Sequence, residues 1–376
     1  MPGSSLYTKP FVLAALASFL FYSNTNAYTL LPLYIQALGG REGEIGSIMA
    51  MYSVAAVLCQ AGVGPFLDRW RRKPVILLGA GILAVVSTAF TLTTHLGWHF
   101  YLLRFLQGVA ISLFLTSNLT LIADLAPPSR RAEAVGIFGV SGLVSIALAP
   151  AIGEMVLHGW GFRWFFFTTM LVAVGALIVC LATTMPRVVS ADNSGGLGLN
   201  FWRTFFPILT AALLFGLASS IVFVFLPPFA SYAGLPRIGP FYLLYTSAAI
   251  AVRLLGGRVA DRLGRPQVIL PSLVGLATGV LLFSILRSTW LLLIIAVING
   301  ASHGFLYPAA SALAFDRAPR GGRGRALAAY NMASVSGGAL GALGFGWMAQ
   351  FVGYRVGFLI AGLILMSGAL LFWRKR

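Results

Sequence analysis

One short motif occurs twice in this chain, as GPFLDRWRRK at residues 64–73 and as GRVADRLGRP at residues 257–266. Each copy follows a long apolar segment and places a glycine four positions before an Asp-Arg pair. Glycine lets two helices approach closely, a carboxylate is stabilised near a helix N-terminus, and clustered arginines are typical of cytoplasmic loops. The copies lie about 193 residues apart, and at a similar offset Pro32 matches Pro227, Gly39 matches Gly234 and Asp124 matches Asp316. The sequence therefore predicts a duplicated unit.

The composition is typical of a membrane protein. Of the 376 residues, 59% are hydrophobic and 9% are charged, whereas soluble proteins carry about 25% charged residues. Soluble globular, disordered and disulfide-rich classes are excluded, because none of them could hide so much apolar surface. The net charge of +17 does not indicate a nucleic-acid partner, since Lys and Arg lie in short clusters between apolar segments. Cys59 and Cys180 lie inside such segments and are expected to be inert packing residues.

Twelve apolar segments are long enough to cross a lipid bilayer as helices. They cover residues 10–37, 43–67, 74–94, 99–126, 132–157, 161–184, 204–231, 236–260, 266–286, 289–315, 323–350 and 353–373. We therefore expect an all-α integral membrane protein with twelve transmembrane helices, arranged as two parallel six-helix repeats. An N-terminal bundle (1–185) and a C-terminal bundle (204–376) are joined by a Ser/Gly/Asn-rich cytoplasmic linker (186–203). Most loop Lys and Arg residues lie on the side of both termini, which predicts cytoplasmic N- and C-termini.

The duplicated motif matches the pattern G-x-x-x-D-R-x-G-R, with Arg71 departing from it. Through this motif the chain resembles the major facilitator superfamily over essentially its whole length, and in particular its bacterial drug/sugar efflux type. The resemblance implies a latch for the outward-open state, in which Asp68 faces the start of the segment 323–350, Arg72 pairs with Asp124, and Arg265 pairs with Asp316. The predicted latch residues are Asp68, Arg69, Arg72, Asp124, Asp261, Arg262, Arg265 and Asp316. The alternative is a basic loop that only sets the topology.

A buried arginine in the fourth segment requires a partner. Arg104 and Gln107 resemble the R-x-x-q-G element of the same family, and a cation inside a membrane is costly unless it is paired. Glu154 in the fifth segment is the expected partner, because the turn near residue 128 places both groups at a similar depth if the two helices pack as antiparallel neighbours. Such an ion pair would either brace the fold or exchange protons during transport.

The fifth segment also resembles the family's antiporter motif, with three substitutions. Gly136, Ser145, Pro150 and Gly153 keep its spacing of small and helix-bending residues. This pattern favours export, although small residues at such a spacing are also usual in helix packing.

The fold of this family places a substrate cavity between the first, fourth, seventh and tenth helices, near the middle of the membrane. The polar residues expected to line it are Tyr22, Asn24, Asn26, Arg104, Gln107, Asn118, Ser219, Ser220, Asn299, His303 and Tyr307. Hydrogen bonds between helices are the alternative role for the three asparagines Asn24, Asn26 and Asn299 and for His303.

Titratable groups inside the membrane are few. The candidates for proton coupling are Glu154, His303 and Arg104, and a neutral packing histidine is the alternative for His303. Arg253 would either attract an anionic substrate or support the nearby loop. Because the first and fourth segments contain no buried acid, a neutral, amphipathic or anionic substrate is favoured over a strongly cationic one.

The sequence therefore predicts a secondary active transporter that moves a small organic molecule across the cytoplasmic membrane by alternating access, in the direction of proton-coupled export. Without a phosphate-binding loop, a metal-ligand cluster or a catalytic motif in the sequence, we expect no ATP-driven pumping, no enzymatic activity, no metal and no cofactor. We expect it to act as a monomer. The alternatives are an importer, a lipid or lysolipid flippase, and a membrane sensor that transports nothing.

Overall fold

The computed structural model describes residues 6–69, 72–127, 130–184, 199–318 and 323–375, and the regular structure in these ranges is entirely helical. The elements are α1 (Lys9–Ala27), η1 (Tyr28–Leu30), α2 (Leu31–Ala37), α3 (Glu42–Arg69), α4 (Arg72–Thr91), α5 (Trp98–Leu125), α6 (Arg131–Ala182), α7 (Leu199–Tyr232), α8 (Gly239–Leu263), α9 (Arg265–Phe283), α10 (Thr289–Arg317) and α11 (Arg323–Lys375).

The two longest elements each contain two helices that meet at a glycine. Gly161 in α6 has φ 82° and Gly353 in α11 has φ 79°, a left-handed conformation that glycine adopts without steric cost. Gly39 and Gly234, with φ 87° and 70°, turn the chain after α2 and after α7. Both glycine pairs recur at nearly the spacing of the sequence motif, so the backbone turns are repeated along with the sequence.

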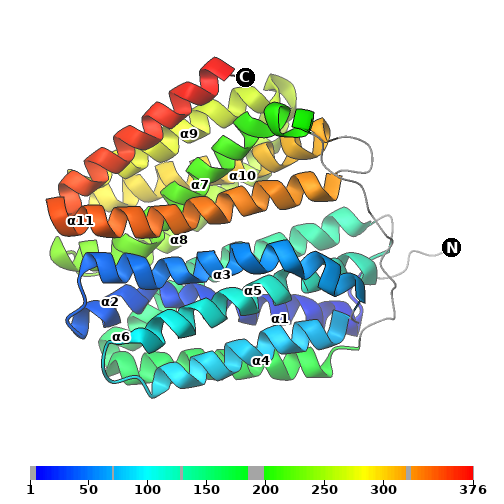
Figure 1. The fold of residues 1–376 in the computed structure, drawn as a ribbon, viewed down its shortest axis with the longest axis horizontal. Coiled ribbons are helices and arrows are strands. Elements are labelled where there is room, and N and C mark those ends of the chain that lie inside the picture. The colour runs from blue at the N-terminus through cyan, green and yellow to red at the C-terminus, as the bar shows by residue number, and fades with distance from the viewer. Residues whose placement is uncertain (1–5, 70–71, 128–129, 185–198, 319–322, 376) are drawn as a thin grey trace.

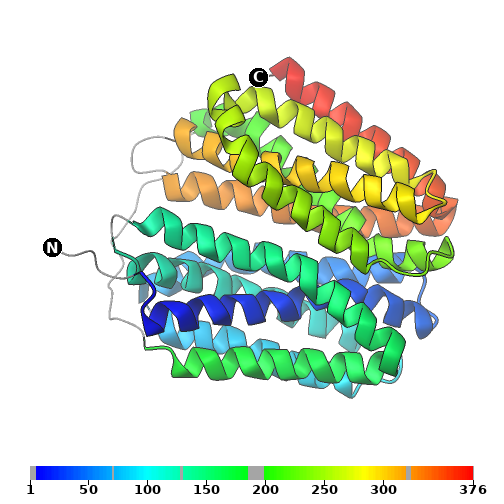
Figure 2. The same ribbon diagram turned by 180° about the vertical axis from the view of Figure 1, so that it is seen from behind.

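The helices lie in two groups. Helices α1 to α6 occupy the lower part of Figure 1 and helices α7 to α11 the upper part, and Figure 2 shows the same division from behind. At the border α3 packs along the first part of α11, and α6 packs against α8. Gly46 of α3 and Gly346 of α11 allow this close approach, because a side chain at Gly46 would collide with the backbone of Ala342 and Gly346.

The outer surface suits a bilayer. Eight helical stretches among the described residues are long and apolar enough to cross a membrane. Large aliphatic side chains such as Val85 and Leu254 point outward, with 69% and 78% of their surface exposed. Exposed tryptophans mark helix ends: Trp98 begins α5, Trp160 precedes the kink at Gly161, and Trp290 lies in the first turn of α10. Tryptophan at helix ends is typical of a membrane–water interface.

Candidate functional site

Four hydrogen bonds between described residues connect the two helix groups at one end. The Glu154 carboxylate of α6 accepts two of them, from the backbone N–H of Ile238 at 2.7 Å and of Gly239 at 2.6 Å. At the same end the backbone N–H of Gly43 donates to Gln350 Oε1 at 3.0 Å, and Trp347 Nε1–H donates to Ser47 Oγ at 3.2 Å. We call these four hydrogen bonds the outer contact.

Glu154 has the geometry of a charged cap on a helix that belongs to the other group. Ile238 and Gly239 begin α8, where the N–H groups have no partner within the helix and the helix dipole is positive. The carboxylate is 7% exposed and is the only buried acid among the described residues. A buried carboxylate that accepts two N–H bonds at a helix N-terminus is stabilised by both hydrogen bonding and the dipole.

The predicted ion pair between Arg104 and Glu154 is wrong. Arg104 Nη1 donates instead to Gln107 Oε1 on its own helix, at 2.7 Å, and its guanidinium lies over the Tyr52 ring, 4.9 Å from the centroid. The reasoning failed because it assumed that helices consecutive in sequence pack along their lengths. The first part of α6 packs mainly on α1 and reaches α8, whereas α5 packs mainly on α3 and α4.

The predicted asparagines fasten helices within one group. Asn24 Nδ2 donates to Ser87 Oγ at 3.0 Å and to the carbonyl of Thr169 at 2.7 Å, which ties α1 to α4 and α6. Asn26 donates to Ser145 Oγ on α6, and Asn118 donates to Ser18 Oγ and the Ala14 carbonyl on α1. Asn299 donates to the Ile295 carbonyl of its own helix. These amides are therefore engaged in helix packing.

A cluster of aromatic and basic side chains occupies the middle of the C-terminal group. The Tyr245 hydroxyl and His303 Nδ1 are 2.5 Å apart, and the Phe215 ring stands edge-on to the imidazole at 4.8 Å. Tyr307 contacts the rings of Phe215 and His303 at 5.9 and 6.4 Å, and Tyr330 at 5.8 Å. We call these residues, together with Arg253, the α10 cluster.

Tyr22 connects the α10 cluster to the N-terminal group. It lies on α1, packs edge-on against Phe138 with 5.8 Å between ring centroids, and lies near both Tyr52 and Tyr307. Ser219 and Ser220 are half-buried on α7, and the Ser219 hydroxyl has no partner among the described residues. The structure thus brings Tyr22, His303 and Tyr307 together, whereas the amides of Asn24, Asn118 and Asn299 donate to other groups.

Part of the predicted latch lies among the residues that the structure describes. Arg265 at the start of α9 forms an ion pair with Asp316 at the end of α10. Asp124 lies in the last turn of α5. The side chains of Asp68, Arg69, Arg72, Asp261 and Arg262 lie outside the described residues.

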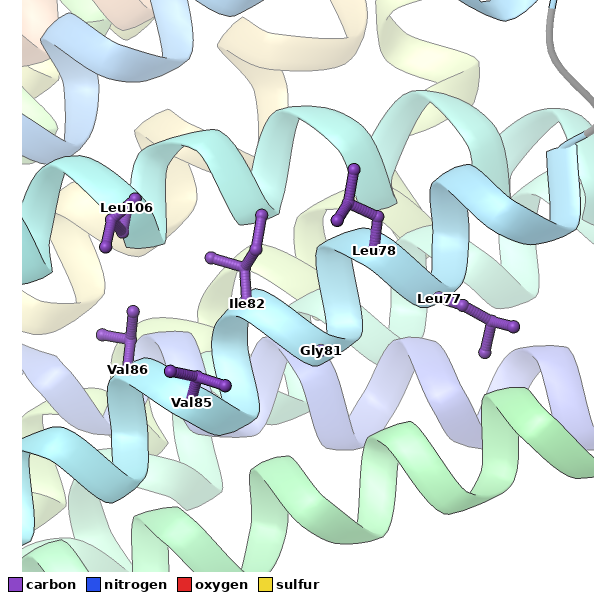
Figure 3. Close-up of a pocket in the computed structure, with 7 residues that line it drawn as sticks. All are labelled: Leu77, Leu78, Gly81, Ile82, Val85, Val86 and Leu106. Carbon is purple, nitrogen blue, oxygen red and sulfur yellow. The ribbon is translucent and has the colours of Figure 1, made fainter.

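An apolar hollow on the outer face is unsuited to a polar substrate. Figure 3 shows that α4 supplies nearly all of its lining and α5 supplies Leu106, and every side chain in it is aliphatic. No predicted site residue contributes to it. Its exposed residues, such as Val85, fit contact with lipid chains.

Sequence reasoning named Arg253, His303 and Tyr307 but missed Tyr245, and it missed the backbone donors of the outer contact. Tyr245 and Arg253 are eight residues apart on α8, and His303 and Tyr307 are four apart on α10, so each pair shares a helix face. That spacing could have pointed to the α10 cluster. Ile238 and Gly239 contribute backbone N–H groups, for which a sequence carries no residue-type signal.

A comparison with known families decides the identity. The model of the Major Facilitator Superfamily matches residues 13–253 and 238–376, which together cover nearly the whole chain. The chain belongs to the major facilitator superfamily. It is therefore a membrane transporter and not an enzyme.

Individual members of the superfamily give a consistent result. The chain is 24% identical over 389 residues to multidrug resistance protein MdtG of Citrobacter koseri, covering 92% of this chain and 89% of that one. It is 26% identical over 180 residues to multidrug resistance protein MdtL of Klebsiella pneumoniae, covering 47% and 45%. The crystal structure of nucleoside transporter NupG has a TM-score of 0.80 at 16% identity, covering 98% of this chain and 99% of that one. An inward-facing bacterial homolog of the lysosomal transporter Spinster has a TM-score of 0.74 at 17% identity, covering 100% and 99%.

Proposed function

We propose that this chain exports a small organic molecule across the cytoplasmic membrane in exchange for protons, acting as a monomer by alternating access. In this proposal the moving bodies are two six-helix bundles, residues 1–185 and 204–376, joined by the linker 186–203. Twelve spans result when α1, η1 and α2 count as one helix and when α6 and α11 are each divided at their glycine kink. The repeated glycine turns support two equivalent bundles.

The observation that carries the proposal is the position of the outer contact. All its hydrogen bonds lie at the end where α3 and α8 begin and where the first part of α11 ends. The basic motif loops lie at the opposite end, which the excess of Lys and Arg places in the cytoplasm together with both termini. Among the described residues, hydrogen bonds that join the bundles at the outer end are those expected when that end is closed, as in a transporter that faces the cytoplasm.

Glu154 provides a way to couple this contact to protons. When ionised, its carboxylate holds the first turn of α8 and so keeps the outer end closed. Protonation from the outside removes the negative charge and one acceptor, which weakens the outer contact and lets the outer end open. His303 in the α10 cluster is the second titratable group that we assign to proton coupling, since its Nδ1 lies at hydrogen-bond distance from Tyr245.

Export is the direction favoured by the relatives, because both listed above are named as multidrug resistance proteins. The test is flux in proteoliposomes that carry purified protein and an imposed proton gradient, with a panel of labelled compounds offered on either side. The proposal predicts saturable, gradient-driven movement of at least one compound against the direction of proton flow. Movement in the same direction as the protons would favour an importer, transfer of fluorescent lysolipid between leaflets a flippase, and binding without flux a sensor.

A further inference from the structure

Two arginines lie inside the membrane-spanning region, one in each bundle, and neither pairs with an acid among the described residues. Arg104 is 5% exposed, and the only hydrogen bond it makes to a described residue is the one to Gln107, which leaves its Nε without a partner. Arg253 is half-buried, forms no ion pair with a described acid, and its buried Nε has no hydrogen-bond partner. An uncompensated cation at this depth is costly, and such residues commonly mark a substrate route.

Five of the acids that the structure describes are engaged or located elsewhere. Within the described residues, Glu133 pairs with Arg130, Asp316 with Arg265, and Glu154 binds the first turn of α8. Glu42 and Glu44 lie in the first turn of α3, at the outer end. These acids therefore do not compensate the charges of Arg104 and Arg253, and the two positive charges disfavour a cationic substrate.

Tyrosines connect the two arginines. Arg104 lies over the ring of Tyr52, and Tyr52 lies near Tyr22. Tyr22 also lies near Tyr307 of the other bundle, and Tyr307 lies near Arg253. Arg104 lies about 9 Å along α5 from its outer end and Arg253 about 21 Å along α8 from its outer end, at a rise of about 1.5 Å per residue. The row thus extends from the outer half of the membrane to the inner half.

We propose that this row binds a small organic anion with an aromatic body, and that Arg253 and Arg104 supply the positive charge its anionic group requires. This inference rests on the proposed function and names its substrate class. A guanidinium with free N–H groups forms strong hydrogen bonds to carboxylate or phosphate oxygens, and the tyrosine rings offer faces on which an aromatic body packs. Arg253 is nearer the cytoplasm and meets the anion first when the outer contact is closed, whereas Arg104 is nearer the outer end.

The test uses the full-length protein in nanodiscs and three probes of the same shape, namely 2-naphthoate, its neutral amide 2-naphthamide, and the cation 2-naphthylmethylammonium. Equilibrium dialysis measures their binding to the wild type, Arg253→Gln, Arg104→Gln and Arg253→Lys. Arg163→Gln, which removes an exposed arginine from α6, is the matched control. Loss of a charge-assisted hydrogen bond predicts a decrease of about 10- to 100-fold in naphthoate affinity for both Gln variants. Arg253→Lys should keep most of the affinity, and Arg163→Gln should keep all of it.

The outcomes separate the site from the transport function. Thermal unfolding of every variant identifies a binding loss caused by misfolding. If Arg253→Gln is misfolded, naphthoate binding to Arg253→Lys decides whether the charge at residue 253 is needed. Naphthoate binding no tighter than naphthamide binding, or unchanged in both Gln variants, overturns the anion site even if gradient-driven transport of other compounds is found. Selective naphthoate binding that depends on Arg253 supports the site, and if no gradient drives naphthoate across the membrane, only the proposed function fails.

Discussion

Replacing Glu154 by glutamine should open the outer end of the protein. In the closed outer contact the two carboxylate oxygens accept from Ile238 and Gly239, at 2.7 and 2.6 Å. Glutamine has one acceptor oxygen, and its amide N–H₂ would face a backbone N–H in place of the second. A hydrogen bond to a charged group contributes about 1.5–3 kcal/mol and a charge at a helix terminus up to about 2 kcal/mol. Because the two effects overlap, we expect the variant to destabilise the closed outer state by about 2–3 kcal/mol relative to the open one.

That loss corresponds to a shift of about 30- to 150-fold in the equilibrium between the cytoplasm-facing and outward-facing states. Double electron–electron resonance measures it with spin labels at Leu92 and Trp290, which are 77% and 79% exposed at the outer ends of α4 and α10. The labels are introduced as Leu92→Cys and Trp290→Cys after Cys59 and Cys180 have been replaced by serine. Glu154→Gln should raise the population of long distances markedly.

Glu44→Gln is the control for Glu154→Gln. Glu44 is also an acid at the outer end, but its carboxylate accepts from the N–H of Arg41 within the same bundle, at 3.1 Å. Glu44→Gln should therefore leave the distance distribution unchanged. If Glu154→Gln gave the wild-type distribution, Glu154 would have no part in closing the outer end.

Three further predictions concern other parts of the structure. Gly46→Val should prevent closure at the outer end, because the valine side chain would collide with the backbone of Ala342. Long distances between the outer spin labels should dominate, and transport should decrease at least about tenfold. Normal closure would contradict the packing of α3 on α11. Asn24→Ala should lower the free energy of unfolding by about 1–3 kcal/mol, measured by thermal unfolding in detergent, with substrate affinity nearly unchanged; a large loss of affinity at full stability would instead make Asn24 a binding residue. His303→Gln should flatten the dependence of transport rate on pH. Tyr245→Phe should keep that dependence but lower the rate. An unaltered pH profile in His303→Gln would exclude His303 from proton coupling.

Much of the fold follows from local sequence features. Long apolar segments predict the helices, and Gly161 and Gly353 lie within a few residues of the predicted ends of consecutive spans. These span ends were predictable because glycine combines freedom of φ with a break in helix propensity. The absence of a loop at either kink was not predictable, since it depends on how the two helices pack after the turn.

The arrangement of side chains between helices was harder to predict. Asn24 and Asn118 are polar residues in the middle of the membrane, and their sequence position fits a substrate site as well as a bond to a neighbouring helix. Glu154 was expected beside Arg104 because depth in the membrane is readable from the sequence. Which helices are neighbours depends on the whole bundle. In this protein Glu154 of α6 lies against the start of α8.

The most direct test of alternating access is a reversible crosslink across the outer contact. Gly43 and Gln350 belong to different bundles, and the N–H of the first donates to the side chain of the second at 3.0 Å. A chain with Gly43→Cys and Gln350→Cys, joined by a short reducible thiol-specific crosslinker, should lose gradient-driven flux in proteoliposomes and regain it on reduction. A crosslink between Asn24→Cys and Ser87→Cys, within one bundle, should leave that flux largely intact. Full flux with the outer pair still joined would show that the two bundles need not separate there, and would contradict the account.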